Sequence, residues 1–434
     1  MLDIKFIREN AEKIKKAVKD KKVDLDVDQL LDIDSKRRTL LQQKEELKAK
    51  QNSLSKTKPD EKTIEELKHI KNEISILEEE FSKADESYIK LMVKVPTIPS
   101  ADVPFGKDDS ENVEIFRSKE PSKFNFPAKS HIELAEQLDL LDFKNGAKVS
   151  GYRGYYVKNQ AVMLQMGLMM YTLEKLIKKG FQPMIPPTIV REFALFGSGY
   201  FSGLKFNPEV DEIYKIANNE EKQADGSVNK EDKFLVGTAE PSLLAYFSGE
   251  ILKKENLPLK LCGFSPCYRS EIGSYGKNTK GLYRVHEFMK IEQVGITSAN
   301  IEEAEKLHNE FISIAKEIHE DLKLPYRQLL ICTGDLGAGK YKQYDIEAWI
   351  PSMDGWGETG SASNFLDWQS RRLNVKYEED NGEKKYVYML NSTAAPSPRL
   401  LISIIENYQQ KDGSVLVPKV LQKYTGCKII KNKK

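Results

Sequence analysis

Charged and aromatic side chains alternate with mostly apolar ones between residues 282 and 296. Successive side chains of a strand point to opposite faces, so one face would carry Arg284, His286, Phe288, Lys290 and Glu292. Cations, an aromatic ring and a carboxylate on one surface suit a ligand that is anionic, planar and amine-bearing at once. We therefore expect this face to bind such a ligand.

The segment before this face adds further charge. An apolar run through Leu259, Leu261 and Phe264 ends in Arg269-Ser270-Glu271, and a loop of Gly, Ser, Asn, Lys and Tyr follows it. The pattern predicts a strand, a long loop and a returning strand. An aminoacyl adenylate has the chemistry that this hairpin could bind. The alternative is a polar hairpin that only faces solvent.

The hairpin resembles motif 2 of the class II aminoacyl-tRNA synthetases, whose pattern is Arg-x-Glu, a variable loop and Arg-x-x-x-Phe. Arg269, Glu271, Arg284 and Phe288 occupy those positions. The whole run SPCYRSEIGSYGKNTKGLYRVHEF is similar to the seryl-tRNA synthetase family in particular. The resemblance implies that ATP activates L-serine as seryl-adenylate, and that serine then passes to the 3′ end of tRNA(Ser). It leaves tRNA(Sec) open as a second substrate.

The resemblance also assigns nucleotide contacts. It implies that Arg269 clamps the α-phosphate and the serine carboxylate, and that Arg399 holds the γ-phosphate. Phe288 would stack on adenine, sandwiching it against Arg399. The remaining expected ATP contacts are Glu271 and Glu287 at the adenine amino edge, Arg284 of the motif, and Glu358 with Ser361 as ligands of Mg²⁺.

The expected serine pocket comes from the same likeness. Thr238-Ala239-Glu240 looks like the family's serine-binding Thr-x-Glu, although alone it is more typical of a helix start. The full expected set is Thr238, Glu240, Arg269, Glu292, Asn391 and Thr393. Polar groups that hydrogen-bond the serine hydroxyl would reject analogues without one by roughly 10⁴-fold. We expect no general base from the protein and no separate editing domain.

Arg399 follows a stretch that resembles motif 3. The family usually has glycines before this arginine, whereas Ala395, Pro396 and Pro398 stand here. The apolar segment after it predicts a buried helix. This segment therefore departs from the family in the backbone before the arginine, but it keeps the arginine.

Residues 29–93 have a different composition, without glycine and rich in Lys and Glu. Apolar residues recur every seven positions on both sides of a break at 58–60, which predicts an antiparallel coiled-coil arm of two helices. Thr63 and Glu66 look like a capping box at the second start. At 1.5 Å per residue, the arm would reach roughly 40–45 Å. The apolar series are Ile33, Leu40, Leu47, Leu54; Ile70, Leu77, Ala84, Leu91; and Leu67, Ile74, Phe81, Tyr88.

Four lysines lie near the tip of this arm: Lys48, Lys50, Lys56 and Lys58. No acidic residue lies between the first and the last, so they could contact nucleic-acid phosphates. The alternatives are a solvated charged face or a dimerising coil. The resemblance favours the first interpretation, because the family carries an N-terminal arm that grips the long variable arm of its tRNA.

Two further segments belong to the expected catalytic domain. Residues 161–179 predict a long helix, and Gly180 to Pro187 matches the family's motif 1, which implies a homodimer; an ordinary buried helix has the same pattern. Ser130 is placed to cap a preceding helix. Residues 191–234 are rich in Asn, Glu, Asp and Gly and predict a mobile surface insertion.

Length and composition set the frame. A chain of 434 residues suggests two or three domains, and a net charge of +1 means that any basic surface is local. The four cysteines show no paired CxxC spacing, so we expect free thiols in a cytoplasmic protein. No apolar run approaches membrane length, and the start does not resemble a signal peptide.

Together these observations predict an α+β protein. Residues 1–108 would form an N-terminal tRNA-binding domain with the arm, and 109–434 a class II catalytic domain built on an antiparallel sheet flanked by helices. ATP, Mg²⁺, L-serine and tRNA(Ser) are the expected ligands. The alternatives are an amino acid ligase that charges a carrier protein, and a non-catalytic RNA-binding protein derived from a synthetase.

Overall fold

The computed structural model describes residues 1–56, 60–121, 123–217, 221–222, 226, 228–229, 231–272 and 280–432. The chain divides into two compact units, Met1–Ile98 and Pro99–Lys434. The sequence analysis placed the boundary after residue 108. Residues 100–106 hydrogen-bond within the second unit, as the Ser100 N–H does to the Tyr341 carbonyl at 2.9 Å. The predicted domain limits of 1–108 and 109–434 stay a prediction.

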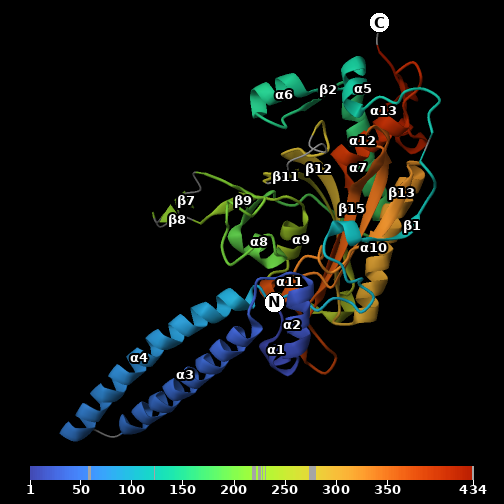
Figure 1. Cartoon of the computed structure of the whole chain (residues 1–434). Coiled ribbons are helices and arrows are strands. Elements are labelled where there is room, and N and C mark those ends of the chain that lie inside the picture. Colours follow the sequence, from blue (N-terminus) through green and yellow to red (C-terminus); the bar gives the residue numbers. More distant parts are fainter. Residues whose placement is uncertain are drawn as a thin grey trace. The chain divides into compact units, whose positions relative to one another are not determined.

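The first unit consists of two short helices and the predicted arm. The short helices are α1 (Ile4–Glu9) and α2 (Ala11–Asp20). The arm pairs α3 (Val27–Leu54) with α4 (Glu61–Met92), and Figure 1 shows the two helices running back along each other. Buried Leu40, Ile70, Ile74 and Ala84 belong to the predicted series, so the heptads did locate the contact between the helices.

The expected capping box at Thr63 and Glu66 is wrong. Helix α4 begins two residues earlier, and Asp60 caps it by accepting hydrogen bonds from the Thr63 N–H at 2.8 Å and the Thr63 hydroxyl at 2.6 Å. Asp and Thr are both good N-cap residues, so the sequence is compatible with a helix that is capped by either Asp60 or Thr63. The sequence analysis counted Asp60 as part of the break.

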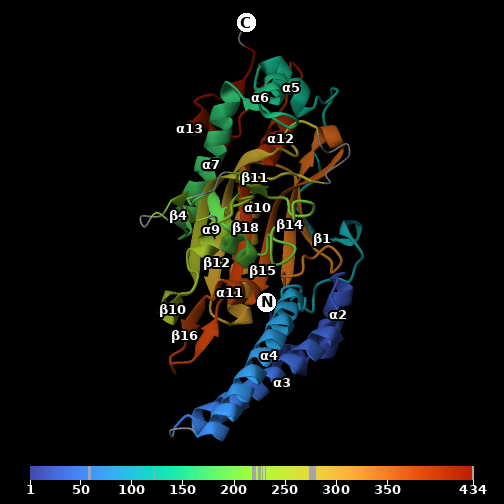
Figure 2. The ribbon, with the colours of Figure 1, turned by 90° about the vertical axis from the view of Figure 1, so that its left-hand side faces the viewer.

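The second unit is built on an eight-stranded sheet in the order β1-β13-β14-β15-β18-β12-β11-β4. All neighbours are antiparallel except β11 and β4. Figure 2 looks onto the central strands. The strands are β1 (Val113–Arg117), β4 (Gln182–Met184), β11 (Leu259–Tyr268), β12 (Glu287–Thr297), β13 (Tyr326–Leu330), β14 (Lys342–Ile350), β15 (Gly355–Leu366) and β18 (Tyr388–Pro396).

Helices pack on both faces of this sheet. The main core joins α7 (Gln160–Lys178), α10 (Ile301–Asp321) and α12 (Ser397–Asn407) to one face. A second core joins α9 (Glu240–Ala245) and α11 (Trp368–Leu373) to the other, where Val294 and Ile296 point. Figure 1 shows α9 and α10 on opposite sides of the sheet. By strand alternation, Phe288, Lys290 and Glu292 face the side of α9.

The predicted loop-rich surface insertion at 191–234 is wrong for the part that the structure describes in full, whereas its mobility stays a prediction. Strands β5 (Ile189–Arg191), β9 (Lys233–Leu235) and β6 (Tyr214–Lys215) form a small sheet beside α8 (Glu192–Ser198). Leu195, Phe201, Ile213 and Phe234 are buried together there. The polar composition that suggested mobility lies mostly in 218–230, and 218–220, 223–225, 227 and 230 are outside the described residues.

Three smaller expectations are also settled. Ser130 does cap α5 (His131–Leu138), through a complete capping box with Glu133. All four cysteines are free. Within the described ranges, every helix is too short or too polar to cross a membrane.

Candidate active site

The hairpin of β11 and β12 positions the motif 2 residues. The strands pair in register from Leu259 with Ile296 to Tyr268 with Glu287. The chain therefore leaves β11 and re-enters β12 at the same end of the sheet. Residues 269–271 and 284–288 meet at this end, while 273–279 of the predicted loop lie outside the described residues.

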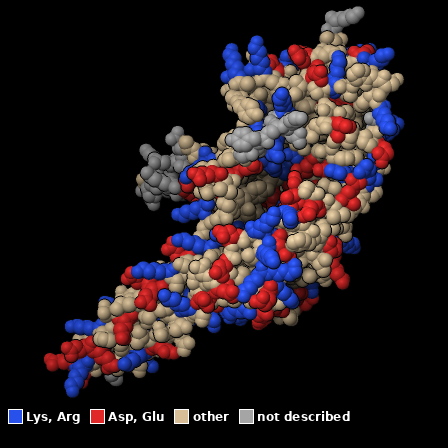
Figure 3. Space-filling view, in the orientation of Figure 1, with Lys and Arg blue, Asp and Glu red and all other residues tan. Residues whose placement is uncertain are grey.

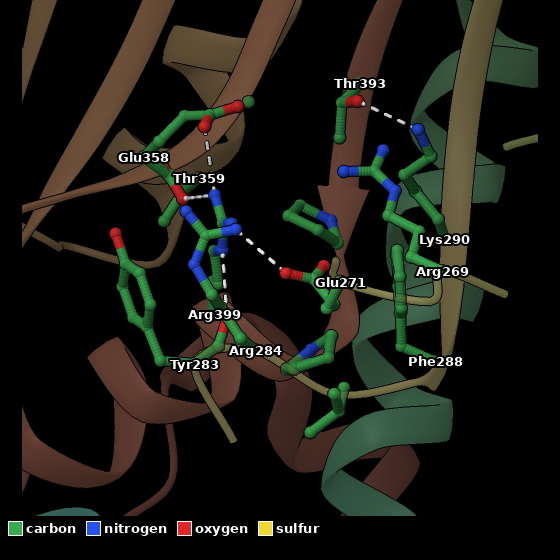
Figure 4. Close-up of a pocket in the computed structure, with 14 residues that line it drawn as sticks. Arg269, Glu271, Tyr283, Arg284, Phe288, Lys290, Glu358, Thr359, Thr393 and Arg399 are labelled. Atoms are coloured by element: carbon green, nitrogen blue, oxygen red, sulfur yellow. Dashed lines mark hydrogen bonds and ion pairs between the residues drawn. The ribbon is translucent and has the colours of Figure 1, made fainter. Parts of the chain in front are cut away.

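One pocket opens at this end, and segments distant in sequence line it (Figure 4). The lining residues are Arg269, Glu271, Tyr283, Arg284, Val285, Phe288, Lys290, Glu358, Thr359, Gly360, Thr393, Pro396, Pro398 and Arg399. Motifs 2 and 3, together with residues 358–360 of β15, thus contribute to the same pocket.

Arg399 lies at the start of α12 and its guanidinium contacts two elements. One nitrogen, Nη1, lies 3.0 Å from Glu358 Oε2 and donates to the Glu358 carbonyl at 2.9 Å; Nε donates to the Tyr283 carbonyl at 3.3 Å. Burial raises the pKa of Glu358, but the charges of Arg399 and Arg269 and the hydrogen bond from Arg399 together outweigh this effect and hold that pKa below its ordinary value. The pocket therefore keeps a fixed cation at this position.

The backbone before Arg399 follows a path that needs no glycine. Strand β18 ends at Pro396, which is the N-cap of α12. Pro398 lies in the first turn, where a missing N–H leaves no helical hydrogen bond unmade. A proline-rich start is therefore compatible with the helix that presents Arg399.

Arg269 and Phe288 lie on the opposite side of the pocket from Arg399 in Figure 4. The Arg269 guanidinium carbon is 5.6 Å from the Phe288 ring centroid, and that of Arg399 is 4.8 Å from the Tyr283 ring. Each arginine thus has its own aromatic neighbour. The space between the two sides is where the expected sandwich of adenine between Phe288 and Arg399 would have to form.

Glu271 is held by cations on two sides. Its carboxylate Oε2 lies 2.8 Å from Arg284 Nη1 and 3.9 Å from Arg153 Nη1. Arg153 also donates to the Glu271 carbonyl at 3.4 Å. The sequence analysis did not assign Arg153, because its segment carries no motif that would have marked it.

Glu287, expected at the adenine edge, is not among the lining residues. It is the first residue of β12, next to Phe288, and neighbouring residues of a strand point to opposite faces. Its side chain is exposed. The structure therefore does not bring Glu287 to the pocket with the other predicted contacts.

Buried Glu240 contacts one other residue of the expected serine pocket, Asn391, and two residues that were not expected. Its Oε1 accepts hydrogen bonds from Gln369 Nε2 and Asn391 Nδ2, both at 2.7 Å, and its Oε2 accepts one from the Tyr200 hydroxyl at 2.9 Å. Burial, reinforced by the Glu292 charge, raises its pKa to about 7. Tyr200 and Gln369 were missed by the sequence analysis.

Thr238 lies at the same site, and its hydroxyl is buried without a hydrogen-bond partner among the described residues. Unpaired buried hydroxyls are costly, so such a group commonly awaits a ligand or a water. The Thr238 hydroxyl therefore has an unused capacity to hydrogen-bond a polar group.

Glu292 is joined to Lys290, which lies on the same face of β12. The Lys290 ammonium is 2.6 Å from Glu292 Oε2 and donates to the Thr393 hydroxyl at 3.2 Å; that hydroxyl donates to Glu292 at 3.1 Å. The alternating sequence of β12 predicted that Lys290 lies on the ligand-binding face, but no role was predicted for it. Lys290 also lines the pocket that contains Arg399, so this pair lies between that pocket and the Glu240 cluster.

A bulge in β15 brings the expected Mg²⁺ ligands to one face. Residues three apart in a regular strand, such as Glu358 and Ser361, would point to opposite sides. Ile346 pairs with Gly360 and Glu347 with Glu358, so Thr359 is the extra residue. Ser361 then pairs with Asp345 and shares a face with Glu358. Burial and the charge of Glu358 raise the pKa of Asp345 to about 8.

These side chains offer oxygen donors, which Mg²⁺ prefers, and Mg²⁺ takes few ligands from the protein when phosphates supply the rest. The described residues include no group of three or more His, Cys, Asp or Glu side chains arranged around one metal. The donor set is therefore compatible with an ion held jointly by the protein and nucleotide phosphates.

The arm lysines are not an unpaired basic patch. Lys48 lies 2.9 Å from Glu78 and Lys50 lies 2.6 Å from Glu66, both on the facing helix. Figure 3 shows Lys and Arg interspersed with Asp and Glu along the arm. Lys56 is exposed, and Lys58 lies outside the described residues. Exposed pairs of this kind contribute about 0–1 kcal/mol, so a phosphate can compete for the lysines.

Two family models match parts of this chain. The family model "Seryl-tRNA synthetase N-terminal domain" matches residues 1–99, and "tRNA synthetase class II core domain (G, H, P, S and T)" matches residues 218–408. The chain is 42% identical to a serine–tRNA ligase of Borrelia garinii subsp. bavariensis, over 98% of each chain. It is 41% identical to that of Treponema denticola, over 98% of this chain and 99% of the relative.

Solved structures show the same likeness. The crystal structure of a seryl-tRNA synthetase from Pyrococcus horikoshii complexed with ATP matches with a TM-score of 0.88 and 36% identity, over 100% of both chains. A cytoplasmic serine–tRNA ligase from Naegleria fowleri in complex with AMP matches with a TM-score of 0.85 and 30% identity, over 100% of this chain and 99% of that chain.

Proposed function

Because this chain belongs to the seryl-tRNA synthetase family, we propose that it is a class II serine–tRNA ligase whose reaction takes place in the pocket between β12 and α12. It activates L-serine with ATP and transfers the seryl group to tRNA(Ser). The observation that carries this assignment is that Arg269 and Phe288 of motif 2 and Arg399 of motif 3 line one pocket.

In the first half-reaction, a serine carboxylate oxygen attacks the α-phosphorus of ATP. The bond from that phosphorus to the bridging oxygen breaks, and pyrophosphate leaves. Such phosphoryl chemistry depends on positioning and charge neutralisation, because the protein has little covalent chemistry to perform. In the second half-reaction, the terminal ribose hydroxyl of tRNA attacks the seryl carbonyl, and AMP leaves.

We propose the nucleotide contacts that the family resemblance implies, and the lining of the pocket supports them. Arg269 offers a planar fork of donors to the α-phosphate and the serine carboxylate. Arg399 binds the γ-phosphate, where its contact with Glu358 fixes its orientation. Phe288 stacks on the adenine. Glu271, held by Arg284, is placed to read the adenine amino group.

Serine recognition uses the buried polar cluster. The unpaired Thr238 hydroxyl and the carboxylates of Glu240 and Glu292 provide acceptors for the substrate amine and hydroxyl. An analogue without the hydroxyl would leave such buried groups unsatisfied. Lys290 neutralises part of the local negative charge. Asn391 and Thr393 complete the cluster, by holding Glu240 and Glu292 respectively.

Glu358 and Ser361 would hold Mg²⁺ together with nucleotide phosphates, with Asp345 beside them. When bound, the ion would neutralise phosphate charge as pyrophosphate leaves. The contribution of the chain is the bulge at Thr359, which gives the two ligands a common face.

The arm, an exposed helix face and the localisation complete the proposal. The tRNA phosphates contact four lysines of the arm: Lys48, Lys50, Lys56 and Lys58. If tRNA(Sec) is a second substrate, the same arm would bind it. Val162, Met163, Met170 and Ile177 are exposed on α7, and we propose that a second copy covers them in a homodimer. We also propose that the protein acts in the cytoplasm.

The test is ATP–pyrophosphate exchange with a panel of amino acids, followed by charging of tRNA(Ser). The proposal expects exchange with serine alone, and seryl-tRNA as the product. Exchange with another amino acid would overturn the substrate assignment. A carrier-protein ligase would show exchange without tRNA charging, and a non-catalytic RNA-binding protein would show neither.

A further inference from the structure

His131 is buried at the first position of α5 and touches two segments of the catalytic unit. Its Nδ1 lies 2.8 Å from Glu406 Oε1, and its backbone N–H donates to the same oxygen at 2.8 Å. The Leu282 N–H donates to its Nε2 at 3.2 Å. His131 does not line the nucleotide pocket.

These contacts determine the tautomer. A backbone N–H can only donate, so Nε2 must be an acceptor without a proton. The ring proton is therefore on Nδ1, where it is donated to the Glu406 carboxylate. In this form, the His131 ring accepts a hydrogen bond from the Leu282 N–H at Nε2 and donates one to Glu406 from Nδ1.

The end of the motif 2 loop is built around this ring. Gly281 has φ of +67°, and a Cβ at this position would lie 2.1 Å from His131 Nε2. A side chain at 281 would therefore be strained and would also displace the ring. The close approach at Gly281 is independent of the hydrogen bond at Leu282, and both place the returning loop on His131.

Glu406 connects the ring to the rest of the pocket. It is fully buried, and it also accepts hydrogen bonds from the Ser352 N–H at 2.8 Å and the Ser352 hydroxyl at 2.9 Å. Ser352 lies in the turn before β15, which carries Glu358. Glu406 lies on α12, about two turns after Arg399. The Glu406 carboxylate thus connects α12, which carries Arg399, to the turn before β15, which carries Glu358.

The Leu282 contact supplies the third connection. Leu282 is followed by Tyr283, whose carbonyl accepts from Arg399 Nε at 3.3 Å and whose ring lies against the Arg399 guanidinium. A shift of Leu282 would move Tyr283 and release one side of Arg399. We propose that His131 is a positioning residue for ATP, because it fixes Leu282 and hence the Tyr283 contact that aims Arg399. This inference rests on the proposed function, in which Arg399 binds ATP.

Two substitutions separate the two ring contacts. In His131→Asn, the amide nitrogen lies near the position of Nδ1 and can still donate to Glu406, but the side chain is too short to reach Leu282. In His131→Gln, the carbonyl oxygen lies near the position of Nε2 and can accept from the Leu282 N–H. The measurement is ATP–pyrophosphate exchange, with KM determined separately for ATP and for serine.

We expect His131→Asn to raise the KM for ATP about tenfold, as expected for one lost hydrogen bond, and to leave the KM for serine within about twofold. His131→Gln should keep the KM for ATP within about threefold of wild type. Ser130→Ala is the control, because it removes the neighbouring cap of α5 without touching Leu282. Equal effects of the Asn and Gln variants, or an unchanged KM for ATP in His131→Asn, would overturn the proposal.

Hydrogen exchange of the wild-type protein gives a second test if a variant does not fold. The Leu282 amide should be protected without ligand and more strongly protected with ATP. Exchange at the rate of an unprotected amide would refute the contact. Failure of the proposed function is a separate result, because wild type would then show no serine-dependent exchange at all.

Discussion

Replacing Glu240 by Gln should stabilise the ligand-free protein above pH 7 and weaken serine binding. The ordinary pKa of this carboxyl is 4.5, and burial raises it to about 7 in the folded chain. The folded state therefore holds a proton that the unfolded state releases between these values. Stability from this group is fully present below pH 4.5, falls as pH rises, and is lost above about pH 7.

The structure sets the size of the effect. A shift from 4.5 to about 7 corresponds to about 3 kcal/mol at pH 8, and to about 1.4 kcal/mol at pH 5.5. Glutamine never ionises, and its carbonyl can still accept from Gln369 and Asn391. The stability difference between Glu240→Gln and wild type should therefore grow by about 2 kcal/mol from pH 5.5 to pH 8.

Urea unfolding followed by tryptophan fluorescence measures this difference. The chain has three tryptophans, and all of them (Trp349, Trp356 and Trp368) lie in the second unit with Glu240. Glu209→Gln, at an exposed carboxylate of the same unit, should show no such growth with pH. A difference that is equal at pH 5.5 and pH 8 would refute a raised pKa at Glu240. In exchange assays, the wild-type KM for serine should rise as pH falls below about 7, and Glu240→Gln should lack this change.

Three other perturbations have defined outcomes. Glu292→Ala leaves Lys290 without its carboxylate partner and should reduce serine-dependent pyrophosphate exchange at least about 100-fold; an unaffected rate would remove Glu292 from the site. Arg399→Lys keeps a positive charge but loses the fork of donors, so the KM for ATP should rise about tenfold with little change in that for serine; equal rises in both would indicate a general loss of structure. Replacing residues 29–93 by a short linker should spare pyrophosphate exchange and abolish tRNA charging, and intact charging would disprove the role of the arm.

The features that could be predicted depend on short-range patterns. The heptads at Leu40 and Ile70 located the helix contact, because burial of one stripe imposes a period on the sequence. The alternation that puts Phe288 and Lys290 on one face likewise follows from strand geometry, and both residues do line the pocket.

The missed features depend on contacts between distant segments. Tyr200 and Gln369 reach Glu240 from other elements, and no local pattern marks a residue for burial beside a carboxylate. The partners of Lys48 and Lys50 lie on the facing helix, so a linear search for acidic neighbours could not find them. The bulge at Thr359 inverts the simple alternation of β15, and only the pairing with β14 reveals it.

The arm also has an adjustable length. Its two helices pair along their length, so matched insertions can be made beside the tip without disturbing the helix contacts near residues 27 and 92. Seven extra residues in each helix would lengthen the arm by about 10 Å and preserve the heptad phase. The same insertion in one helix alone would leave about two helical turns unopposed. The distance between the tip of the arm and its base can therefore be changed in steps of one heptad.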